Sequence, residues 1–114
     1  MHVTHRIEGN ICLLKLEGTL VVGNQDTVDQ YIRTLPSTTM QTLILNLKKV
    51  SYMDSGAAGW LVHIFQHLTS QGQQLGLCEC APSVAKLLNL LSLDKHFSIY
   101  KTEQEAIEFY KKQP

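Results

Sequence analysis

The sequence has no excess of charge of either sign, because ten lysines and arginines balance ten aspartates and glutamates. This balance does not indicate binding to nucleic acid or to an anionic membrane surface. No apolar run reaches the roughly 18 residues that a membrane-spanning helix needs, and the N-terminus lacks the apolar core of a signal peptide. Three cysteines at no framework spacing favour a reducing environment. We therefore expect a cytoplasmic protein without direct contact with membranes or nucleic acid.

The motifs of common enzymes are also missing. The glycines of the segment DSGAAG are not followed by the Gly-Lys-Ser/Thr of a phosphate-binding loop, and no Gly-x-Ser-x-Gly motif occurs. His63 and His67 lie four residues apart, but Ile64 stands where the zinc-protease motif has glutamate, so a solvated histidine face is the better interpretation. Asp54 has no second carboxylate nearby for acid–base catalysis. The sequence therefore predicts no enzyme, no metal site and no cofactor.

Hydrophobic periodicity predicts one α/β domain over residues 1–114, in the order β-β-α-β-α-β-α-β-α. Strands separated by helices are expected to be parallel. The first helix should start near Asn24 or Asp26 and end at Pro36, and the last opens with a capping-box pattern at Thr102. The predicted strands cover residues 2–7, 11–17, 43–47, 75–80 and 97–100, with a further extended segment over 19–22.

The segment from Leu43 to Gly72 is the centre of this pattern. It begins with a buried strand, passes through a polar turn and enters a helix that Gly72 closes. Asp54 and Ser55 stand at the junction, where either side chain can cap the first helical turn. The apolar stripe of this helix comprises Ala58, Leu61, Ile64, Phe65 and Leu68.

Two residues of this segment have both a functional and a structural interpretation. Ser55 is either a phosphorylation site, because a helix N-terminus tolerates phosphate well, or a plain capping serine. Trp60 is either an exposed contact residue beside a functional loop or a residue that packs against a neighbouring helix. The residues alone leave both pairs of alternatives open.

The central YMDSGAAGWLV resembles the Asp-Ser-(Ser/Thr)-Gly-Leu-Gly signature of STAS domains, the family of bacterial anti-sigma factor antagonists. The C-terminal LLNLLSLDKHFSIYKTEQEAIEF is similar to the late helix, turn, strand and last helix of the same family. The resemblance covers essentially the whole chain. It implies a STAS fold, with a mixed sheet of four to five strands and about four helices packed mainly on one face.

The resemblance also implies a switch by partner binding. In such proteins the unphosphorylated antagonist binds an anti-sigma factor that is also a serine kinase. Phosphorylation in the Asp-Ser loop blocks binding, and a PP2C-type phosphatase restores it. For this chain the resemblance implies that Ser55 is the phosphorylated residue and that Asp54 orients it. Gly56, Ala57 and Trp60 would then form part of the partner contact.

The sequence departs from the sporulation-type pattern at several positions. The second hydroxyl after the aspartate, the usual acceptor, is replaced by Gly56, and Ala57 replaces the following glycine. The family's turn after the second strand reads Gly-Glu-Leu-Asp, and the matching residues here are Gly18, Thr19, Leu20 and Val21, so its acidic residue is missing. Ser55 is the acceptor that remains. A single hydroxyl followed by a small residue also fits accessory STAS subunits of lipid-transporting ABC systems, whose partner is the transporter ATPase. A non-phosphorylated stressosome-type scaffold is a third alternative.

Overall fold

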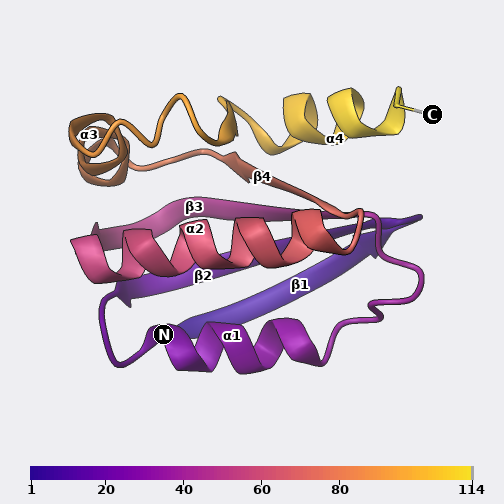
Figure 1. Ribbon diagram of the computed structural model, residues 1–114. Helices are drawn as coiled ribbons and strands as arrows, with labels where there is room; N and C mark the ends of the chain where they lie inside the picture. Colours follow the sequence, from indigo (N-terminus) through magenta and orange to yellow (C-terminus); the bar gives the residue numbers. More distant parts are fainter. Residues whose placement is uncertain (114) are drawn as a thin grey trace.

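The computed structural model describes residues 1–113 as a five-stranded sheet with four helices (Figure 1). The order of elements is the one that the periodicity predicts. The elements are β1 (His2–Glu8), β2 (Ile11–Leu20), α1 (Gln25–Arg33), β3 (Thr42–Met53), α2 (Ser55–Ser70), β4 (Gln74–Cys78), α3 (Pro82–Leu90), β5 (Ser98–Tyr100) and α4 (Glu103–Lys111).

The strands lie side by side in chain order, β1-β2-β3-β4-β5. The hairpin of β1 and β2 is antiparallel, and its turn contains Gly9 with a φ of +59°. Each later strand is parallel to the one before it, because a helix returns the chain to the same end of the sheet. The predicted mixed sheet is confirmed.

Alternating side chains of β2, β3 and β4 divide the core into two clusters, one on each face of the sheet. On the first face Leu14, Leu45 and Leu77 pack with the apolar residues of α1, α2 and α3. On the other face, Ile44 and Cys78 pack under α4. Three of the four helices thus cover one face, as the fold resemblance implies; in Figure 1, α2 crosses the sheet in front of β2 and β3.

The longest strand, β3, differs most from its prediction. The polar turn expected after Leu47 is absent, and the strand continues to Met53. The pairing of β2 with β3 shifts register twice, so the buried residues Val50 and Met53 do not follow strict two-residue alternation. Without that alternation the sequence of this segment indicates a turn rather than a strand. β2 also runs to Leu20, so the predicted extended segment 19–22 is strand only in its first half.

Several helix and strand ends also differ from the prediction. α1 ends at Arg33 rather than at Pro36, and Asn24 does not cap it with its side chain. β4 stops at Cys78 rather than at Cys80, and the next residue, Glu79, adopts a left-handed φ of +53°. Leu91, expected on the inner face of α3, is exposed beyond the end of that helix. Within residues 1–113, no helix combines the length and apolar character needed to cross a membrane.

Candidate functional site: the Asp54–Ser55 loop

Asp54 joins the start of α2 to the turn between β2 and α1. Of the two residues that the sequence offers as the cap, Asp54 is the N-cap residue of α2, and its Oδ1 accepts a hydrogen bond of 2.8 Å from the backbone N–H of Ala57. Its Oδ2 accepts a second bond, of 3.1 Å, from the backbone N–H of Val22. Both carboxylate oxygens are therefore engaged with backbone, and the two loops form one surface.

Ser55 is the first residue of α2, and its side chain is exposed at the positive end of the helix dipole. It borders an open hollow of about 420 Å³ between the end of β3 and α3, together with Tyr52, Lys86 and Leu90. Tyr52 and Leu90 are large apolar residues that stay 54% and 71% exposed. The hydroxyl thus lies among accessible apolar side chains and one cation, none of which the sequence alone assigns to the site.

A side chain at Gly56 would have to displace Val22. A Cβ atom at this position would overlap Cγ2 of Val22, which lies directly over it and is itself 64% exposed. The space that a Cβ atom would take at the usual acceptor position of sporulation-type sequences is thus occupied by an aliphatic side chain, although Gly56 itself is exposed.

The remaining predicted contact residues differ in accessibility. Ala57 is fully buried in the larger core cluster, so its side chain contributes to packing. Trp60 is half-buried against the same cluster, and its Nε1 donates a 3.3 Å hydrogen bond to Asp29 of α1. This contact matches the interpretation of Trp60 as a residue that packs against a neighbouring helix, although part of its surface remains accessible.

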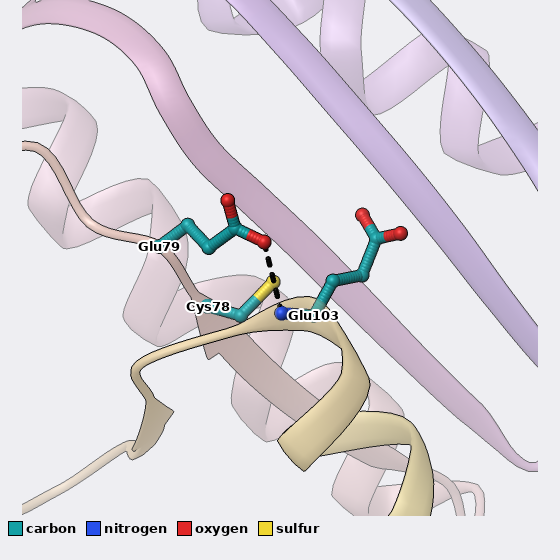
Figure 2. Close-up of side chains that lie close together, drawn as sticks. All are labelled: Cys78, Glu79 and Glu103. Atoms are coloured by element: carbon teal, nitrogen blue, oxygen red, sulfur yellow. Dashed lines mark hydrogen bonds between the residues drawn. The ribbon is translucent and has the colours of Figure 1, made fainter.

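A cluster of Cys78, Glu79 and Glu103 lies on the opposite face of the sheet (Figure 2). The sulfur and one oxygen of each carboxylate lie within 4.8 Å of one another. Burial, with the nearby glutamate charges, raises the pKa of the Cys78 thiol to about 12, so the sulfur stays protonated at neutral pH. Glu79 accepts a 2.9 Å hydrogen bond from the backbone N–H of Glu103 in the first turn of α4, whose N-cap residue is Thr102, as the sequence predicts.

The Glu103 carboxylate links three elements. Its Oε1 accepts from Arg6 of β1 at 2.6 Å, and its Oε2 accepts from Asn46 of β3 at 2.9 Å. Burial alone would raise the pKa of this carboxyl, but the hydrogen bonds from Asn46 and Arg6 and the charge of Arg6 outweigh burial and lower it. No sequence pattern relates these residues, because they are brought together by the sheet.

Replacing Glu103 with glutamine is expected to lower the free energy of unfolding at pH 7 by about 1–2 kcal/mol, because one charge-assisted acceptor becomes a donor facing another donor. The folded-state pKa of Glu103 lies below its unfolded value, so its stabilisation is complete at neutral pH and is lost as the pH falls through the lowered pKa. Urea unfolding at pH 7 and pH 3 should therefore show a difference between wild type and Glu103→Gln that shrinks in acid. A difference that is equal at both pH values would contradict this assignment.

Comparison with known proteins identifies relatives along most of the chain. A STAS-domain containing protein of Pseudomonas aeruginosa is 28% identical over 93 residues, which are 81% of this chain and 90% of that protein. An anti-sigma F factor antagonist of Paenibacillus polymyxa is 26% identical over 98 residues, covering 85% of this chain and 84% of that protein.

The fold is shared with a solved anti-sigma factor antagonist, SpoIIAA in its unphosphorylated form. The TM-score is 0.76 at 24% sequence identity, and the match covers 99% of both chains. The STAS domain family model matches residues 2–106, from the first strand into the last helix. This chain is a member of the STAS domain family and resembles the anti-sigma factor antagonists within it.

Proposed function

We propose that this chain is a cytoplasmic regulator of the anti-sigma factor antagonist type, without enzymatic activity of its own. It binds an anti-sigma factor that is also a serine kinase, and phosphorylation of Ser55 releases this partner. The observation that carries the proposal is the exposed Ser55 hydroxyl at the first turn of α2, beside the exposed side chains of Val22, Tyr52 and Leu90.

The chemistry of the loop supports a phosphorylation switch. A phosphate on Ser55 would add roughly 1.5 to 2 negative charges and a large hydration shell at the centre of an apolar docking surface. The N-terminus of α2 tolerates this charge, so the modification changes the surface and leaves the fold in place. A solved relative, SpoIIAA from Bacillus in the phosphorylated form, has the same fold at a TM-score of 0.73 and 21% identity. A PP2C-type phosphatase would reverse the modification.

One observation favours a second candidate function. Val22 occupies the space beside Gly56, and the loop carries a single hydroxyl, at Ser55. In this respect the loop resembles that of the accessory STAS subunits of lipid-transporting ABC systems, which also have one hydroxyl followed by a small residue. In that role the same surface would bind the transporter ATPase constitutively, without phosphorylation.

Mass spectrometry separates the two functions. The protein is purified from its native cells with phosphatase inhibitors present, and both its intact mass and its peptides are measured. The proposed switch predicts a phosphate on the peptide that contains Ser55. Co-purification with an ABC ATPase, and an unmodified Ser55 under several growth conditions, would contradict the switch and support the second function.

A further inference from the structure

One face of α3 borders the hollow beside Ser55. The residues of α3 that line it lie at positions i, i+3, i+4 and i+7 of the helix, and so on one side of it: Ser83, Lys86, Leu87 and Leu90. The end of β3 and the start of α2 form the opposite wall. α3 is held against β3 by the hydroxyl of Ser83, which donates a 3.2 Å hydrogen bond to the backbone carbonyl of Ser51. Lys86 therefore lies in the middle of a helical face that borders the same hollow as Ser55.

Lys86 is the cation of this hollow and has no countercharge there. Its side chain is exposed, and within residues 1–113 no ion pair joins it to a carboxylate. The other charged side chain that lines the hollow is Asp54. Both oxygens of Asp54 already accept backbone hydrogen bonds, from Ala57 and from Val22. The ammonium group of Lys86 is thus available to an anion that appears beside it.

A phosphate on Ser55 would be such an anion. It brings three acceptor oxygens and roughly 1.5 to 2 negative charges to an exposed residue of the hollow. The side chain of a lysine is long and flexible and ends in three rotatable donors, so its ammonium group can move toward an oxyanion on a neighbouring residue. The hollow, at about 420 Å³, is large enough to hold the phosphate and the ammonium group together.

We infer that Lys86 is the residue that receives the phosphate when Ser55 is phosphorylated. Its ammonium group donates to the phosphate oxygens from α3, and this ion pair occupies space that is open in the unmodified chain. A partner side chain that enters the hollow between Tyr52 and Leu90 in the unmodified state then meets an occupied, charged site. The inference rests on the proposed phosphorylation of Ser55 and identifies the residue within this chain that responds to it.

The test uses the full chain with phosphoserine incorporated at position 55 during synthesis, through a reassigned codon, so that it does not depend on the native kinase. The second ionisation of the phosphate, at about pH 6, is followed by ³¹P NMR. An ammonium group beside the phosphate favours its doubly charged form. The phosphate should therefore titrate at a lower pH in the chain that keeps Lys86 than in Lys86→Gln, by about 0.3 pH units or more.

Three further variants show whether the effect belongs to this hollow. Lys86→Arg keeps the cation and should restore the lower titration pH. Lys86→Glu places a like charge beside the phosphate and should raise the titration pH above that of Lys86→Gln. Lys112→Gln removes a positive charge from an exposed position at the end of α4, outside the hollow, and should titrate as the unsubstituted chain does. Asp54 is present in all of these proteins, so its charge cancels in the comparison.

Two results would overturn the inference. The first is the same titration pH for the unsubstituted chain and Lys86→Gln, and the second is an equally large shift in Lys112→Gln, because net charge rather than Lys86 would then set the titration. The proposed function depends on a separate measurement, the mapping of phosphate on Ser55 in native cells. A phosphate found there, without an effect of Lys86, keeps the switch and removes the role of Lys86. An unmodified Ser55 removes the switch itself, whatever the titration shows.

Discussion

Ser55→Glu is expected to weaken binding to the proposed anti-sigma partner by about 30-fold or more, because burying a carboxylate in an apolar interface costs about 2–5 kcal/mol, of which the exposed Lys86 beside it offsets only a part. The fold should be unaffected. Ser55 is exposed, and a negative charge at the first turn of α2 is favourable to the helix dipole. Isothermal titration calorimetry against the partner measures the first effect, and urea unfolding measures the second.

Two variants control this experiment. Ser55→Ala removes the acceptor hydroxyl and leaves the docking surface neutral, so it should bind the partner and resist phosphorylation. Thr38→Glu adds the same charge at an exposed position in the segment between α1 and β3, outside the hollow beside Ser55, and should bind as the wild type does. If Ser55→Glu keeps the wild-type affinity, the charge of the loop does not control docking and the switch is wrong.

The helices and the cap of α2 were predictable because their signals are local. Of the predicted stripe, Ala58, Leu61, Ile64 and Leu68 are buried in the larger core cluster, and Phe65 packs against it partly buried. Asp54 caps α2 because its position before the first helical turn determines which backbone N–H groups it can reach. Gly72 adopts a φ of +75° just after that helix, the conformation that a glycine at a helix end permits.

The extent of β3 was not predictable from alternation. Lys48 and Lys49 are both exposed, and Val50 and Met53 are both buried, because irregular pairing with β2 rotates the side chains out of a two-residue period. In the sequence, the segment around Lys48 and Lys49 is polar and therefore predicts a turn. The consequence for function is direct, since the longer strand carries Tyr52 to the edge of the hollow beside Ser55.

The contacts around the loop depend on tertiary structure. The sequence shows that Gly56 replaces the usual hydroxyl, but the reason becomes visible only when the turn between β2 and α1 is placed over α2. The backbone N–H of Val22 donates to Asp54, and this bond holds the Val22 side chain above Gly56. The same limit applies to Lys86 and Leu90, which reach the site from α3, some 30 residues further along the chain.

This packing predicts that Gly56→Ser lowers the free energy of unfolding by about 0.5–1.5 kcal/mol, because the exposed Val22 side chain must leave its present rotamer to admit a Cβ atom. The new Cβ displaces Val22 and strains its hydrogen bond to Asp54. Val22→Ala alone should cost little, because the side chain is largely exposed. It also removes the methyl group that a residue at position 56 would meet.

The double variant Val22→Ala/Gly56→Ser should therefore be more stable than the sum of the single changes by about 0.5–1 kcal/mol, a coupling that a double-mutant cycle by urea unfolding resolves. Gly56→Ser with wild-type stability would contradict this prediction, because it would mean that Val22 moves aside at no cost. The wild type, the two single variants and the double variant also test whether Val22 and Gly56 determine which loop residues are phosphorylated. Only the double variant combines an unstrained loop with a hydroxyl at the position that sporulation-type sequences use. In an assay with the partner kinase, it should be the variant that gains a second phosphorylation site.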